Sequence, residues 1–148
     1  MNLKTEELKN GRIKEQLNNM KKSVFRFREF PVYKDAREFR IGLKQLSKKK
    51  FPKDERFCLT AQLWRALDSI LLNIAEGSER YSDVDFSRFL NIALTSVNEV
   101  VACLDAALDD GYTNENEHKA FLSKADIIFR QLKAFTSHVR RSSAGVCS

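Results

Sequence analysis

Seven apolar residues in the second half of the chain recur at alternating intervals of four and three positions, from Phe86 to Ala107. These intervals match the 3.6-residue period of an α-helix, so the pattern predicts one long amphipathic helix that begins after Ser82 and continues to Asp110. Ser82-Asp83-Val84-Asp85 resembles a capping box at its start. Three further segments repeat the pattern: residues 31–50, residues 53–76, and a segment that starts at Thr113 or Asn114 and carries its last apolar position at Val139. The chain is therefore expected to be all-α.

Short connections join these four helices. Phe51-Pro52 breaks the first from the second, Gly77 is expected to close the second as a left-handed cap, and Gly111 ends the third. Sequential helices with short links pack as antiparallel neighbours, which predicts an up-down-up-down four-helix bundle over residues 31–141. A basic extension, residues 1–30, precedes the bundle, and a flexible tail, residues 142–148, follows it.

The end of the extension alternates aromatic and charged residues from Val24 to Phe30, a pattern typical of an extended segment. Two roles remain open for it. The rings of Phe25, Phe27 and Phe30 could pack against the bundle, which the alternation favours. Alternatively, Arg26 and Arg28 could face phosphate groups while the rings stack on bases.

Several classes of protein are disfavoured by the composition. The three cysteines, Cys58, Cys103 and Cys147, are scattered and form no C-x-x-C pair, as expected of reduced thiols in a cytoplasmic protein. No stretch approaches the apolar length of a membrane span, and no metal cluster, phosphate-binding glycine loop or nucleophile–base motif is found. We therefore expect no membrane association, no cofactor, no metal, no small-molecule substrate and no enzymatic activity.

Charge is distributed unevenly along the chain. Residues 1–80 carry 19 Lys and Arg against 11 Asp and Glu, whereas residues 81–148 carry 7 against 9, which gives the overall +6. A basic first half predicts a surface that attracts a polyanion such as nucleic acid. The candidate phosphate contacts are Lys44, Lys48, Lys49, Lys50, Lys53 and Arg56 around one end of the bundle, with Arg26 and Arg28 next.

A stripe of polar residues follows one face of the second helix. It is made of Gln62, Arg65, Ser69, Asn73 and Glu76. Amide and hydroxyl groups on such a face suit specific hydrogen bonds in a partly dry place. The antiparallel register predicts an ion pair between Arg65 and Glu99 of the third helix, joined by Gln62 and Ser96. We expect this network to set the register of helix packing rather than to catalyse a reaction.

Several motifs then match a known family. They are Phe51-Pro52-Lys53-Asp54-Glu55-Arg56-Phe57, Asn73-Ile74-Ala75-Glu76-Gly77 with its flanks, Phe89-Leu90-x-Ile92-Ala93 continued by Ser96 and Glu99, and Pro31-Val32-Tyr33-Lys34-Asp35-Ala36. Together they closely resemble the four-helix bundle proteins encoded by intervening sequences of bacterial 23S ribosomal RNA genes. The resemblance covers about residues 29–140, so it does not interpret the start of the extension.

The resemblance implies a ring-like homopentamer. It also implies a relation to the accessory variability determinant of diversity-generating retroelements, a basic pentamer that binds a reverse transcriptase and nucleic acid. Independently, the second to fourth helices carry more apolar surface than one copy can bury, which predicts a homo-oligomer.

Two functions remain as hypotheses. The first is a non-enzymatic accessory subunit that binds nucleic acid, RNA in particular, and partners a reverse transcriptase. The alternative is a homo-oligomeric protein-interaction scaffold whose N-terminal extension docks a partner protein. Its anchors would be Leu3, Leu8, Ile13, Leu17 and Met20.

Overall fold

The computed structural model describes residues 10–12, 14 and 23–145, and every regular element in these ranges is helical. The all-α prediction is confirmed. In chain order the elements are η1 (Arg26–Glu29), α2 (Pro31–Lys50), η2 (Lys53–Glu55), α3 (Leu59–Ser78), α4 (Asp83–Asp109) and α5 (Glu115–Ala144).

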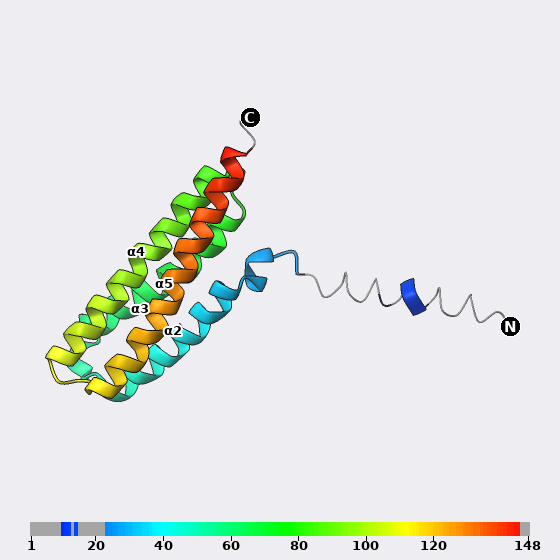
Figure 1. Cartoon of the computed structure of the whole chain (residues 1–148). Helices are drawn as coiled ribbons and strands as arrows, with labels where there is room; N and C mark the ends of the chain where they lie inside the picture. Colours follow the sequence, from blue (N-terminus) through cyan, green and yellow to red (C-terminus); the bar gives the residue numbers. More distant parts are fainter. Residues whose placement is uncertain (1–9, 13, 15–22, 146–148) are drawn as a thin grey trace.

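The four long helices lie side by side as a bundle (Figure 1). α3 packs on α4 and α4 packs on α5, while α2 packs against both α3 and α5. Their apolar stripes meet in one core, as the four-and-three spacing predicts. Residues that are almost completely buried in this core include Leu43, Leu63, Ile74, Leu90, Leu104, Ile128 and Leu132.

Two helix starts follow the capping signals in the sequence. The Ser82 side chain accepts a hydrogen bond from the Asp85 backbone N–H at 3.1 Å at the start of α4. Asn114 and Glu117 form a reciprocal capping box at the start of α5, with distances of 2.8 and 3.1 Å. These side chains satisfy backbone donors that a helix start leaves without partners.

The start of the second predicted helix differs from the expectation. The chain forms the short η2 after Pro52, and α3 begins only at Leu59. Cys58, with φ −115° and ψ −105°, interrupts the helical path. The Glu55 carboxylate then accepts the Leu59 backbone N–H at 3.0 Å, so a side chain from the preceding turn caps α3.

The C-terminal end also differs from the expectation. α5 continues to Ala144, three residues beyond the predicted end of the bundle, so part of the expected flexible tail is helical. Residues 146–148 lie outside the described residues.

Gly77 is not the left-handed cap that the sequence predicts. It lies inside α3, is buried, and has no positive φ; among the described residues only Gly111 has one, at 75°. A Cβ at position 77 would come within 2.7 Å of the Phe89 Cβ and 2.9 Å of the Phe86 Cδ2. The glycine is therefore needed for the close approach of α3 and α4.

The prediction of an extended segment before α2 is wrong, because residues 26–29 form the 3-10 helix η1. Its rings divide between two environments. Phe30 packs with Phe86 and Phe135, with ring centroids 6.4 and 5.1 Å away, and Phe27 meets Tyr33 edge-on at 5.0 Å. Phe25 is 56% exposed. The favoured packing role holds for Phe27 and Phe30 but not for Phe25.

α4 is, contrary to the expectation from sequence, long and apolar enough by length and composition to cross a membrane, with a mean hydropathy of 1.3 over the qualifying window. One such helix is weak evidence for a membrane span, since core helices of soluble proteins have the same length and composition. Here its apolar stripe, including Leu90, Val97 and Leu104, is buried in the bundle core. The absence of a membrane role stays a prediction.

Candidate functional site

The predicted basic cluster spans the end of α2, the η2 turn and the approach to α3, but its cations differ in what surrounds them. Lys49, Lys53 and Arg56 are exposed, and none of the three forms an ion pair with any described residue. The Lys50 Nζ, in contrast, lies 3.7 Å from Glu117 Oε2. The first three are therefore the cations most available to an anion.

Lys44 and Lys48 lie over an aromatic ring. Their ammonium nitrogens are 4.4 and 5.7 Å from the centroid of Trp64. The indole Nε1 donates to Ser47 Oγ at 2.9 Å, and that hydroxyl donates to the Lys44 carbonyl at 3.0 Å. The ring is thus held in one orientation, with two cations attracted to its electron-rich face.

The other two predicted cations are far from this cluster. The guanidinium of Arg26 donates through Nε and Nη2 to the Ser78 carbonyl, with the Nε bond at 3.0 Å. It also lies 5.7 Å from the centroid of the Phe86 ring. Because Ser78 is the last residue of the 20-residue α3, Arg26 is about 30 Å along the helix from Leu59. The structure therefore does not bring Arg26 and Arg28 to the basic end, and Arg26 binds the protein itself.

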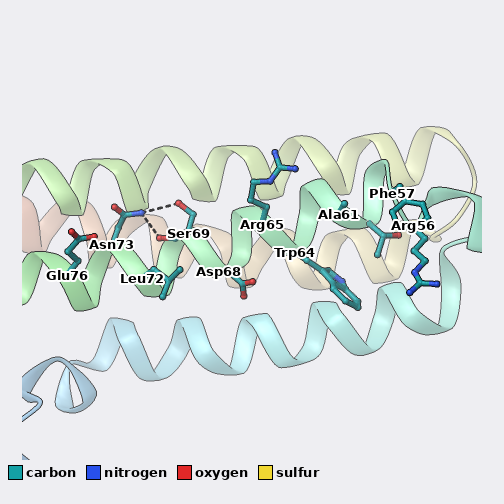
Figure 2. Close-up of a pocket in the computed structure, with 11 residues that line it drawn as sticks. Arg56, Phe57, Ala61, Trp64, Arg65, Asp68, Ser69, Leu72, Asn73 and Glu76 are labelled. Carbon is teal, nitrogen blue, oxygen red and sulfur yellow. Dashed lines mark hydrogen bonds between the residues drawn. The ribbon is translucent and has the colours of Figure 1, made fainter.

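Part of the predicted polar stripe is joined by hydrogen bonds, and Figure 2 shows those between Asn73 and Ser69 within α3. Ser69 Oγ and Ser96 Oγ are 2.7 Å apart, and Ser96 is only 5% exposed. The Asn73 Nδ2 donates to the Ser69 carbonyl at 2.8 Å and to its Oγ at 3.1 Å. The bond between Ser69 and Ser96 links the two helices, and Asn73 bonds to Ser69 within α3, all in a partly buried place.

The predicted ion pair between Arg65 and Glu99 does not form, and Gln62 joins no hydrogen bond with any described side chain. All three are exposed, so water can solvate their charges and amide, and pairing gains little there. In Figure 2 the Arg65 side chain points away from Asp68 and Trp64. Glu76, the last member of the stripe, pairs with Arg80 at 2.6 Å.

A groove of about 840 Å³ runs along the outer face of α3, from Arg56 to Glu76 (Figure 2). Its lining includes Trp64 and every member of the polar stripe except Gln62, and it also carries two apolar side chains that are largely exposed. Phe57 is 83% exposed and Leu72 is 65% exposed. The groove therefore offers cations, hydrogen-bonding groups and bare apolar surface side by side.

Two hydrogen bonds accepted by the Glu55 carboxylate were not predicted from the sequence. Glu55 Oε1 accepts the Tyr112 hydroxyl at 2.9 Å, while its other oxygen caps α3. The bond from the Leu59 N–H, followed by that from Tyr112, lowers the pKa of Glu55, and the same carboxylate raises the pKa of Tyr112 to about 12. No sequence spacing indicates this pair, because the two residues are 57 positions apart.

Burial also raises the pKa of one thiol, that of Cys103. Desolvation, followed by the nearby charge of Glu99, raises the pKa of Cys103, which keeps it protonated at neutral pH.

Within the ranges that the structure describes, no group of three or more His, Cys, Asp or Glu side chains could hold a metal ion. The proposed scaffold anchors Leu3, Leu8, Ile13, Leu17 and Met20 lie outside the described residues.

Comparison with known proteins gives the same fold and a family. The family described as 23S rRNA-intervening sequence protein matches residues 28–134, from η1 through most of α5. The chain belongs to this family. The crystal structure of a protein with unknown function from the S23 ribosomal protein family of Bacteroides thetaiotaomicron is similar, with 26% identity and a TM-score of 0.65. The match covers 71% of this chain and 97% of that one.

A search of curated proteins finds no match. The family resemblance inferred from the Asn73–Gly77 motif and its companions is thus confirmed for the 23S rRNA-intervening sequence proteins. The relation to the accessory variability determinant stays a prediction, since neither match above is to such a protein.

Proposed function

We propose that this 23S rRNA-intervening sequence protein is a non-enzymatic accessory subunit that binds nucleic acid, with RNA as the ligand. One observation carries the proposal: Lys49, Lys53 and Arg56 are exposed together at one end of the bundle and are free of ion pairs among the described residues. Cations without carboxylate partners are available to phosphate groups, and such contacts supply most of the sequence-independent affinity for nucleic acid.

The proposal includes assembly of the antiparallel up-down-up-down bundle into a ring-like homopentamer. The cyclic order of helix packing, α2 to α3 to α4 to α5 and back to α2, supports the antiparallel arrangement. Exposed apolar side chains on several helices, among them Ile41, Val84 and Ile127, support self-association. Five chains of net charge +6 would combine their fields around one axis.

The experiment compares two charge-matched triple variants by anisotropy titration of a structured RNA. The first carries Lys49→Gln, Lys53→Gln and Arg56→Gln. The second carries Lys119→Gln, Lys133→Gln and Arg140→Gln on α5, which removes the same charges from exposed positions elsewhere. We expect the first variant alone to lose affinity, and its slope of log K against log salt to fall by about 2.

Three results would contradict the proposal. The wild-type protein could fail to bind RNA at about 50 mM salt, bind it without any salt dependence, or weaken equally in both variants. The scaffold alternative is tested by deleting residues 1–22, a deletion that spares the contact between Arg26 and Ser78. Loss of a protein partner with RNA binding intact would favour the scaffold. A reverse transcriptase, which the family resemblance implies, is the first partner to test.

A further inference from the structure

The groove along α3 has an excess of positive charge that its own carboxylates do not neutralise. Asp68 Oδ1 is 2.6 Å from the Nε of Arg40, and Glu76 Oε1 is 2.6 Å from the Nη2 of Arg80. Arg56 and Arg65, in contrast, form no ion pair with any side chain that the structure describes. The groove is thus complementary in charge to an anionic ligand.

The same groove exposes an aromatic ring at its end near Arg56. Phe57 is 83% exposed, and the guanidinium carbon of Arg56 is 5.4 Å from its ring centroid. Further along the groove lies the Trp64 ring, with the Lys44 and Lys48 ammonium groups over it. Figure 2 shows Phe57 and Arg56 at one end of the groove and Trp64 between them and Asp68. Cations alternate with flat rings along this path.

We infer that the α3 groove binds a single strand of nucleic acid, with an unpaired base stacked on the exposed ring of Phe57. The phosphates of the strand would lie towards Arg56 and the two lysines over Trp64, with Arg65 on the opposite side of the groove. A stacking ring beside a line of cations is the arrangement by which proteins hold single strands without reading their sequence. The bases of a duplex are already stacked on each other, so a duplex could use only the cations. This inference rests on the proposed function and names its ligand class.

The test measures the affinity of the full-length protein for a labelled oligoadenylate of about 20 nucleotides, which exceeds a typical single-strand site. A fully paired RNA duplex of equal total charge serves as the second probe. We expect Phe57→Ala to weaken oligoadenylate binding about 5- to 100-fold, Phe57→Trp to restore it, and neither to change duplex binding. Phe25→Ala is the matched control, because it removes another exposed phenylalanine outside the groove.

The single tryptophan of the chain supplies a second readout, since Trp64 lines the groove. Oligoadenylate should change the fluorescence of Trp64 in the wild-type protein, and the change should saturate with the binding curve. A duplex held by Lys49, Lys53 and Arg56, away from the lysines over the ring, should leave the fluorescence unchanged. Full oligoadenylate binding without any change at Trp64 would place the strand elsewhere and overturn the inference.

The outcomes separate this inference from the function on which it rests. If the wild-type protein binds neither probe, the proposed function fails and the inference fails with it. If both probes bind but Phe57→Ala binds oligoadenylate as tightly as wild type, only the inference is overturned. If Phe57→Ala lowers the mass of the assembly in solution, the ring is covered by a second copy of the chain, which also overturns it.

Discussion

Glu55 uses both carboxylate oxygens to hold the beginning of α3, one on the Leu59 N–H and the other on the Tyr112 hydroxyl. Both bonds favour the ionised form, so the folded protein holds the pKa of Glu55 below its ordinary value of 4.5. A lowered pKa in the folded state means that the unfolded state binds the proton more readily. The stabilisation is therefore complete above pH 4.5 and is lost as the pH falls through the lower, folded value.

We expect Glu55→Gln to lower the free energy of unfolding at neutral pH, because the amide cannot replace the charge-assisted bonds. The difference from wild type should shrink as the pH falls below about 4.5, which urea unfolding over a pH series would measure. Asp54→Asn is the control, since Asp54 is exposed and accepts no hydrogen bond from any described residue. A difference that does not change with pH would contradict this role for Glu55.

Gly77 supports the structure through its lack of a side chain. We expect Gly77→Ala to destabilise the protein by about 1–3 kcal/mol, since the added Cβ would overlap Phe89 and Phe86. Gly42→Ala is the matched control within α2, where the nearest atom to an added Cβ is a Phe121 ring carbon at 3.1 Å. There the gain in helix propensity of about 1 kcal/mol should offset the contact. Equal thermal stability of the two variants would refute the packing role of Gly77.

At the scale of elements, η1 is fastened to the end of α3 by Arg26. We expect Arg26→Ala to cost about 1 kcal/mol, because the Ser78 carbonyl loses a charged donor and Phe86 loses a cation over its ring. Arg28→Ala removes the same charge from an exposed neighbour and should leave the unfolding midpoint unchanged. If both substitutions have the same effect, charge rather than the Ser78 contact explains it.

The long helices were predictable from sequence, and their side-chain pairs were much less so. Apolar spacing places Phe86 and Leu90 on one face of a helix whatever lies next to it, because the period is a local property of the backbone. Pairing of Arg65 with Glu99 depends instead on the rotation and level of two helices. For α3 and α4, this rotation and level agree with the contact of Ser69 with Ser96 and with the close approach that Gly77 allows.

At the scale of the whole molecule, exposed apolar groups such as Val84 and Ile127 predict self-association. We expect light scattering to give a mass several times the 17.1 kDa of one chain, with five times that value for the proposed ring. The mass should persist at high salt, since burial of apolar surface is not screened as ion pairs are. A mass of 17.1 kDa at all concentrations would contradict the ring.

By itself the sequence determined the number and approximate limits of the long helices, their apolar faces, the cap at Ser82, and the family. Each of these depends on residues close together in the chain. Only the tertiary structure decided which cations stay unpaired, because some of them form ion pairs with carboxylates distant in sequence, as Lys50 does with Glu117. It likewise decided that Arg26 binds Ser78 and that Phe57 remains exposed, since solvent access depends on every neighbouring element.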